Sequence, residues 1–353
     1  MSTKGSIMNA RRPWAWPLVP LYALVSGIAQ RLKARRARRL QWPVLSVGSL
    51  SAGGAGKTPV VIALIKLLQH RGWQVDVLSR GYKRFGDGIQ RVELALNDRS
   101  VEGDEISEAL WFGDEPVMIA QRTGADVWVG ADRYQVGLAA EAAAETTDAN
   151  TQRHLHLLDD GFQHVQLARQ INTALVTLED LDDALLPAGN RREPISALRK
   201  ADVLVVRDNE QAQVLPRIAR YQRPEAAVWI IRRRLDFDSP LSVLGAGFRP
   251  MAFCAIARPT DFAGMLLSTG CGIIETMAFP DHHRYLDGDI ASILATAKRL
   301  NASGIITTEK DSVKLSPAMR DKLATIGPLL IAKLRVEFAA PDTVLRTVEE
   351  RTA

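Results

Sequence analysis

The chain has 353 residues, of which 46% are hydrophobic and 24% charged, and its formal net charge is +5. The length favours two domains or one large α/β unit. The apolar fraction excludes a disordered chain, and the mean hydropathy of −0.05 excludes a polytopic membrane protein. Two cysteines, Cys254 and Cys271, are too few for a disulfide framework or a zinc cluster and indicate a reducing compartment.

The positive charge is concentrated near the N-terminus. Residues 31–39 hold six cations, which exceeds the net excess of the whole chain. The remainder is close to neutral, so a basic face for nucleic acid is not indicated. We therefore expect no nucleic-acid partner.

Residues 13–29, just before that run, carry no charge. As a helix they would reach about 25 Å, short of a bilayer core of about 30 Å. Trp14 and Trp16 are of a residue type that favours the headgroup zone. We expect residues 1–40 to form a membrane-anchoring helix with a basic interfacial run; whether it spans the bilayer or lies in the interface stays open. The alternative is an ordinary core helix with a solvated basic tail.

From residue 44 onward, short β-branched runs alternate with longer amphipathic stretches. This alternation predicts an α/β fold, a parallel sheet with helices on both faces. The predicted strands are 44–47, 74–78, 126–129, 154–158, 173–178 and 203–206, with helices at 58–70 and 134–147 among them.

A stretch rich in Gly, Pro and Ser at 236–250 resembles a linker. After it come further strands at 252–256, 272–277, 304–307 and 329–334, and a helix at 287–300. We place a boundary near residue 245, which gives an anchor (1–40), a core domain (41–245) and a smaller C-terminal α/β domain (246–353).

A phosphate-binding loop is predicted after the first strand. The run Ser51-Ala52-Gly53-Gly54-Ala55-Gly56-Lys57-Thr58 joins a strand to a helix start. Small residues let backbone N–H groups surround a phosphate at a helix N-terminus, while the lysine supplies a cation and the threonine offers a hydroxyl to Mg²⁺. Ser51 departs from the general pattern, which has Gly there. The alternative is a glycine-rich loop with an incidental lysine.

Two acidic turns complete the predicted chemistry. Asp159 and Asp160 end an apolar strand, where a phosphate loop commonly finds a metal-ordering carboxylate. Asp114, in Gly-Asp-Glu-Pro, is a candidate acceptor for the proton of an alcohol that receives a phosphoryl group. Without the phosphate loop, Asp159 and Asp160 would be interpreted as helix caps. For Asp114, a helix start without chemistry is an equal alternative.

Two charged clusters follow predicted strands in the second half. In the first, His282 and His283 come directly after Asp281, and a histidine beside a carboxylate can orient or tune a base. The second is Thr308-Glu309-Lys310-Asp311, which also suits a solvated, capped helix start.

Six short motifs in this order carry a resemblance. They are residues 51–59, Ser79-Arg80-Gly81-Tyr82, residues 113–116, residues 159–164, Asp281-His282-His283 and residues 308–311. Together they closely resemble the tetraacyldisaccharide 4′-kinase family, the lipid A kinases of Gram-negative bacteria, over nearly the whole chain. In that family Ser or Thr stands at the position of Ser51.

The resemblance implies a P-loop kinase of two domains with the nucleotide between them. It implies transfer of the γ-phosphate of ATP to the 4′-hydroxyl of an acylated glucosamine disaccharide 1-phosphate in lipid A biosynthesis. By motif, Lys57 and Thr58 hold phosphates and Mg²⁺, and Asp159 and Asp160 order the metal and phosphates. Asp114 acts as the base with His282, which is preferred over His283 for its place after Asp281.

The remaining expectations concern partners. From charge alone, Arg80 and the cations Arg191 and Arg192 are candidates to face the substrate phosphate. The lipid substrate places the enzyme at the cytoplasmic face of the inner membrane, and no obligate protein partner is expected. Two rivals stay open: a membrane-associated P-loop ATPase switch that recruits a protein, and a kinase of a soluble metabolite.

Overall fold

The computed structural model describes residues 12–54, 56–94, 100–101, 104–105, 107–145, 153–238 and 247–352. Its strands are β1 (Val44–Ser49), β2 (Trp73–Ser79), β3 (Gln90–Arg91), β4 (Ser100–Val101), β5 (Asp104–Glu105), β6 (Val127–Val129), β7 (Arg153–Asp159), β8 (Ile171–Val176), β9 (Val203–Arg207), β10 (Ala227–Phe237), β11 (Pro250–Cys254), β12 (Glu275–Ala278), β13 (Gly304–Thr308) and β14 (Leu329–Phe338).

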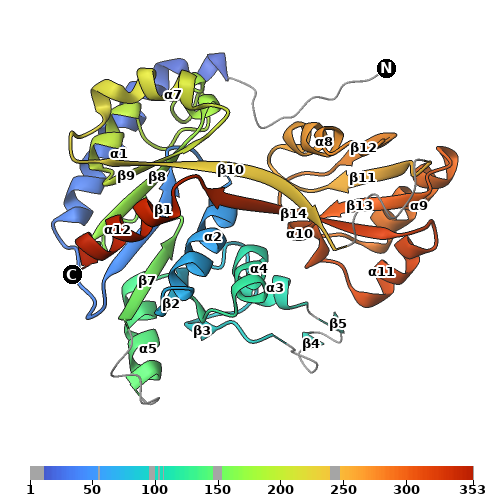
Figure 1. Cartoon of the computed structure of the whole chain (residues 1–353), viewed down its shortest axis with the longest axis horizontal. Coiled ribbons are helices and arrows are strands. Elements are labelled where there is room, and N and C mark those ends of the chain that lie inside the picture. The colour runs from blue at the N-terminus through green and yellow to red at the C-terminus, as the bar shows by residue number, and fades with distance from the viewer. Residues whose placement is uncertain are drawn as a thin grey trace.

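Helices cover both faces of the sheet (Figure 1). The α-helices are α1 (Val19–Ala34), α2 (Lys57–Gln69), α3 (Glu108–Phe112), α4 (Asp114–Thr123), α5 (Arg133–Glu145), α6 (Leu178–Asp182), α7 (Gln211–Ile218), α8 (Pro259–Ser268), α9 (Asp287–Arg299), α10 (Glu309–Ser312), α11 (Pro317–Ala324) and α12 (Pro341–Thr352), and the 3-10 helices are η1 (Pro13–Leu18), η2 (Ile195–Lys200) and η3 (Ala219–Tyr221).

Within the described residues, twelve strands form one sheet in the order β12-β11-β13-β14-β10-β9-β8-β1-β7-β2-β6-β3, and β4 and β5 pair separately. The first block consists of β6, β2, β7, β1, β8 and β9, in sheet order. These strands run parallel to one another and to the start of β10. The strands β14, β13, β11 and β12 run parallel to one another and form the second block. The predicted parallel α/β sheet is thus confirmed, with antiparallel pairs at β10–β14 and β3–β6.

The register of β10 decides how the two blocks face each other. Residues 227–231 pair with β9, whereas residues 231–237 continue beyond β9 and pair with β14. The second block therefore lies past the carboxyl end of the first, and its strands point back towards it. Figure 1 shows β10 and β14 as long strands crossing between the two parts of the molecule. This arrangement brings the carboxyl ends of both blocks to one cleft.

Sequence patterns located most strands of the sheet, with shifts of a few residues. The strand predicted at 173–178 lies at Ile171–Val176, and the one predicted at 252–256 lies at Pro250–Cys254. β10 was not predicted, because Arg232, Arg233 and Arg234 follow its apolar start and obscure the strand pattern.

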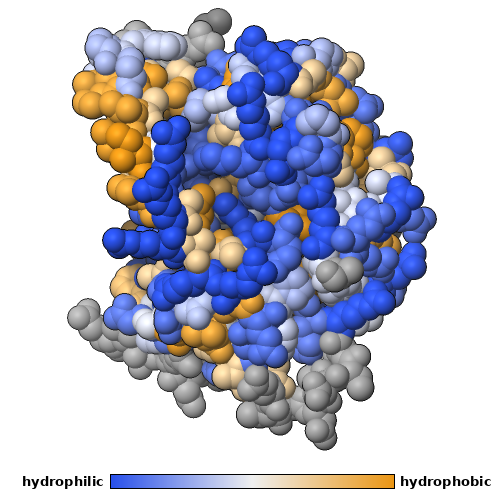
Figure 2. All heavy atoms as spheres, turned by 90° about the vertical axis from the view of Figure 1, so that its left-hand side faces the viewer, coloured by the Kyte–Doolittle hydropathy of each residue, from blue (hydrophilic) through white to orange (hydrophobic). Residues whose placement is uncertain are grey.

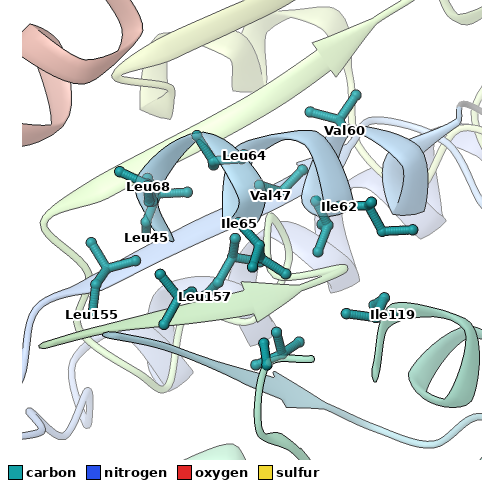
Figure 3. Packing of buried hydrophobic residues seen from close by; sticks show 14 of the residues in the cluster. Leu45, Val47, Val60, Ile62, Leu64, Ile65, Leu68, Ile119, Leu155 and Leu157 are labelled. Carbon is teal, nitrogen blue, oxygen red and sulfur yellow. The ribbon is translucent and has the colours of Figure 1, made fainter. Parts of the chain in front are cut away.

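The core of the first block lies between α2 and the sheet. Leu64, Ile65 and Leu68 of α2 are fully buried against Leu45 of β1 and Leu157 of β7, as Figure 3 shows. Burying each such side chain stabilises the fold by about 1.5–3 kcal/mol. The same cluster contains Val344, Leu345 and Val348 of α12, so the C-terminal helix returns to the first block. The boundary expected near residue 245 falls outside the described residues.

The N-terminal helix exposes its apolar side chains. Leu21, Leu24, Val25, Ile28 and Leu32 of α1 are between 48 and 62% exposed. Figure 2 views the molecule from the side on which α1 lies and shows apolar side chains along one edge beside hydrophilic ones. In the described part of the chain, no helix combines the length and the apolar character needed to cross a bilayer. Residues 1–11 of the expected anchor lie outside the described residues.

Candidate active site

The predicted phosphate loop follows β1 and leads directly into α2. Gly53 and Gly56 have φ of 76° and 87°, a left-handed conformation that glycine adopts without strain. The loop rests on residues 190–192, since the backbone N–H of Ala52 donates to the carbonyl of Asn190 at 3.0 Å. Ala55 lies outside the described residues. In its described part, the loop thus has left-handed glycines, which allow the backbone to curl as a phosphate cradle does.

Lys57 opens α2 and is held by an aspartate. Its Nζ lies 3.2 Å from Oδ1 of Asp160, and Oδ2 of the same carboxylate accepts from Nη1 of Arg192 at 2.9 Å. Burial raises the pKa of Asp160, but the charges of Lys57 and Arg192 outweigh it and lower the pKa to about 2. Asp160 thus stays ionised and holds both cations beside the loop.

Asp159, one residue earlier, has a different environment. Its side chain is 4% exposed, and Oδ1 has no hydrogen-bond partner among the described residues. Burial, with the charges of Glu115 and Asp160, raises its pKa to about 7, although Lys57 opposes the shift. A buried carboxylate with an unpaired oxygen is a site that a cation would stabilise. The structure therefore distinguishes Asp159 from Asp160, which already has its cations.

Asp114 and His282 meet across the cleft. Asp114 begins α4, and its Oδ2 lies 2.9 Å from Nδ1 of His282, which follows β12. Burial raises the pKa of Asp114, but the hydrogen bond from His282 and the charges of Lys310, His282 and Lys314 lower it to about 2. His282 has a φ of 61°, and such strain is concentrated at functional residues.

His283 points elsewhere. Its Nε2 lies 3.0 Å from Oδ2 of Asp289 at the start of α9, and its ring stacks on Phe279. The structure thus brings His282, not His283, to Asp114.

The cleft is lined from both blocks. Gly53, Lys57 and Thr58 line it on one side, and Arg258, His282 and Lys310 on the other. Ile62, Leu235, Ile256, Phe262 and Met265 add an apolar section. Two cations were missed as site residues. Lys310 also suited a solvated helix start, and Arg258 stands in no motif. The one feature of the sequence that could have indicated them is that each follows the carboxyl end of a predicted strand.

The cations considered for the substrate phosphate have separate positions. Arg192 lies beside Asp160, at 2.9 Å, and Arg191 pairs by its backbone with Ser51 of the loop. Arg80 follows β2 and is exposed. The structure brings Arg192 and Arg191 to the phosphate loop.

Comparison with known proteins decides the family. Residues 11–353 match the family described as Tetraacyldisaccharide-1-P 4'-kinase. The tetraacyldisaccharide 4'-kinase of Koribacter versatilis is 36% identical over 345 residues, covering 94% of this chain and 99% of that protein. The chain belongs to the tetraacyldisaccharide 4′-kinase family. It is therefore a kinase, and the resemblance carried by the six motifs is confirmed.

Further similarities agree with this membership. The tetraacyldisaccharide 4'-kinase of Syntrophus aciditrophicus is 38% identical, covering 86% of this chain and 82% of that protein. The crystal structure of LpxK from Aquifex aeolicus, solved in complex with ATP, superimposes with a TM-score of 0.72 at 27% identity, covering 97% of this chain and 99% of that one. The chain thus has the fold of this P-loop kinase over nearly its whole length.

Proposed function

We propose that this chain transfers the γ-phosphoryl group of ATP to the 4′-hydroxyl of a tetraacyldisaccharide 1-phosphate, at the cytoplasmic face of the inner membrane. Family membership supplies the substrate class, since the matched relatives are named for this acceptor. The observation that carries the proposal is the pair of Asp114 and His282, 2.9 Å apart, of which His282 lines the cleft together with the phosphate loop. An ATPase switch has no need of such a pair.

The phosphate loop would hold the donor. Backbone N–H groups of residues 51–56 and the ammonium group of Lys57 would surround the β- and γ-phosphates. Lys57 is already held at the loop by Asp160, so its charge is in place before the nucleotide binds. A group held in place in this way adds no reorganisation cost during the reaction.

Asp114 would receive the proton of the acceptor. The 4′-oxygen attacks the γ-phosphorus, the bond from that phosphorus to the bridging oxygen of ADP breaks, and the hydroxyl proton passes to the carboxylate of Asp114. With a pKa of about 2, Asp114 is ionised at every working pH and accepts a hydrogen bond from the hydroxyl. It is a weak base, which suits a loose transition state in which the proton moves late.

The residues present fit Mg²⁺. The unpaired, buried Oδ1 of Asp159 and the hydroxyl of Thr58 are oxygen donors of the kind this ion prefers. Among the described residues, no group of three His, Cys, Asp or Glu side chains converges on one metal position, as expected for an ion that also takes phosphate oxygens and waters. We infer that Thr58 and Asp159 hold it, with Asp160 beside them; when bound, Mg²⁺ neutralises charge on the β- and γ-phosphates.

The exposed side of α1 supports an interfacial location. Apolar side chains such as Leu24 and Ile28 are 62% and 48% exposed, and the cations of residues 31–39 follow them in the chain. An apolar helix surface beside basic residues is typical of helices that lie in the headgroup region of anionic membranes. The enzyme would then meet a substrate that stays in the bilayer.

The test is a direct assay of the purified chain in lipid–detergent micelles with ATP, Mg²⁺ and tetraacyldisaccharide 1-phosphate. Mass spectrometry should find a lipid product that is heavier by one phosphate. Lys57→Ala and Asp114→Ala should abolish it, whereas Lys322→Ala, which removes an exposed cation, should not. ATP hydrolysis at the same rate without the acceptor would instead support the ATPase switch.

A further inference from the structure

Lys310 is the second residue of α10, the short helix after β13, and its ammonium group lies in the cleft. Nζ is 3.3 Å from Oδ1 of Asp281, 3.5 Å from Oε1 of Glu115 and 3.8 Å from Oδ2 of Asp114. Its side chain is 18% exposed. Because Asp114 and Glu115 belong to α4 and Asp281 to the second block, one cation binds carboxylates from both sides of the cleft.

The contact between Lys310 and His282 constrains the imidazole. Nζ of Lys310 lies 3.4 Å from Nε2 of His282, while Nδ1 of that ring lies 2.9 Å from Asp114. An ammonium group has donors and no acceptor, so this contact is favourable only when Nε2 presents its lone pair. The carboxylate of Asp281 is 3.7 Å from Nε2, beyond hydrogen-bond length. For a neutral ring, this geometry therefore favours the tautomer with its proton on Nδ1.

We propose that Lys310 is a positioning residue for the phosphoryl transfer: it holds Asp114 and His282 together across the cleft and fixes His282 as the tautomer whose Nδ1–H donates to Asp114. This inference rests on the proposed function and deepens it. With His282 donating from Nδ1, Asp114 is oriented and keeps lone pairs for the acceptor hydroxyl. In the opposite tautomer Nδ1 would present a lone pair to an anion, and the pair would repel.

The charges around the pair keep Asp114 ionised. Asp114 faces His282 and Lys310 directly, Glu115 is its neighbour on α4, and Lys314 acts on it from the turn after α10. Burial lowers the pKa of Lys310, but Glu115, Asp114 and Asp281 outweigh it and raise the pKa, so Lys310 is a permanent cation. Removing it takes a stabilising charge from ionised Asp114, and the pKa of Asp114 must rise.

The kinetic test uses Lys310→Met, which keeps the length of the side chain and removes its charge. We expect kcat to fall by about 30-fold or more, with KM for ATP within about threefold of the wild-type value. Lys310→Arg, which keeps the charge, should restore most of kcat, because the cation again contacts the carboxylates on both sides of the cleft.

Two control variants separate positioning from other roles. Arg122→Met removes another ion pair between the two sides of the cleft, at 2.7 Å to Glu309, without touching the Asp114–His282 pair. It should leave kcat nearly unchanged. Lys322→Met, at an exposed ion pair, should also leave the rate unchanged. A loss confined to KM for ATP in Lys310→Met, or a Lys310→Arg variant as slow as Lys310→Met, would overturn the proposal.

A measurement on the wild-type chain tests the proposed tautomer of His282 even if Lys310→Met does not fold. The chain has six histidines, so ¹⁵N-histidine labelling and long-range ¹H–¹⁵N correlation, with His282→Gln for assignment, can determine the tautomer of His282. At pH 8 without ligands we expect the proton on Nδ1; a proton on Nε2 overturns the proposal. Because neither ATP nor lipid is present, this result is independent of whether the chain phosphorylates the proposed acceptor.

Discussion

Nδ1 of His282 lies 2.9 Å from Oδ2 of Asp114, although 168 positions separate the two residues in the chain. Asp114 starts a helix that packs on the first block, and His282 follows a strand of the second. The pair exists only because β10 continues beyond β9 and carries the second block past the carboxyl ends of the first. The arrangement of the two parallel blocks within one sheet therefore brings the pair together.

If Asp114 and His282 act as one unit, their substitutions should not add. Asp114→Asn and His282→Gln should each lower kcat, Asp114→Asn by about 10²–10⁴-fold. The double variant should be no slower than Asp114→Asn alone, because the second substitution removes an interaction that is already lost. Steady-state kinetics of the three variants measures the coupling, and losses that multiply would show that the two side chains act separately.

In the protein without ligands, ionised Asp159 should lower the free energy of unfolding. Its folded pKa is about 7, above the value of about 3.9 of a free aspartate, so the folded state loses stability as pH rises from about 4 to 7. Asp159→Asn should then raise the free energy of unfolding at pH 8 by about 1–3 kcal/mol while it abolishes activity. The gain should vanish at about pH 3, where the aspartate is largely protonated in both states. Denaturant titrations at the two pH values measure it.

Asp160→Asn is the matched control, and its effect on the free energy of unfolding should have the opposite sign. The pKa of Asp160 is lowered to about 2 by Lys57 and Arg192, so its stabilisation is present above about pH 4 and is lost as pH falls towards 2. The asparagine variant should be less stable than the wild type at pH 8. Equal shifts of one sign in both variants would contradict the different environments assigned to the two aspartates.

Sequence patterns predicted the parts of the site that are local. The phosphate loop follows its strand directly, and Asp159 and Asp160 end theirs, so strand, turn and helix signals within a few residues suffice. The partner of Asp114 could not be derived in this way, because it depends on the register of β10. The sequence-based choice of His282 rested on the order of the motif, whereas the structure supplies the physical reason, since His283 is held by Asp289.

The dependence on tertiary structure also explains why the environment of Lys310 could not be predicted from the sequence. A threonine, a glutamate and an aspartate around a lysine are typical of a capped helix start, and Thr308 does cap α10 by accepting from the N–H of Asp311. The capping interpretation was therefore right for Thr308. It was wrong for Lys310, whose side chain is not solvated but lies among carboxylates that are about 30 to 200 residues away in the chain. Only the placement of the second block reveals that environment.

Gly48 should be intolerant of any side chain. It lies in β1 just before the phosphate loop, and a Cβ there would lie 2.5 Å from the backbone nitrogen of Phe162. A backbone atom cannot rotate away, so Gly48→Ala should push β1 from the turn that follows Asp159 and Asp160. We expect a loss of about 1–3 kcal/mol in the free energy of unfolding, with reduced activity. Thermal unfolding and the phosphorylation assay measure the two effects.

Gly27→Ala is the corresponding control. Gly27 lies in α1, and an added Cβ would meet nothing within 4 Å. Alanine in a helix interior is favoured over glycine by about 0.5–1 kcal/mol, so this variant should be neutral or slightly more stable. If Gly48→Ala behaved like Gly27→Ala, the close approach of β1 to Phe162 would be refuted.

The exposed apolar side of α1 should determine membrane binding without contributing to the core. Leu24 and Ile28 are 62% and 48% exposed, so Leu24→Glu with Ile28→Glu should leave the unfolding temperature nearly unchanged. Each lost apolar contact and each added anion should weaken binding to anionic vesicles, giving about a tenfold loss or more in cosedimentation. Leu267→Glu, at a residue of similar exposure (58%) on α8, should bind as the wild type does. Equal binding by the double variant and the wild type would refute α1 as the anchor.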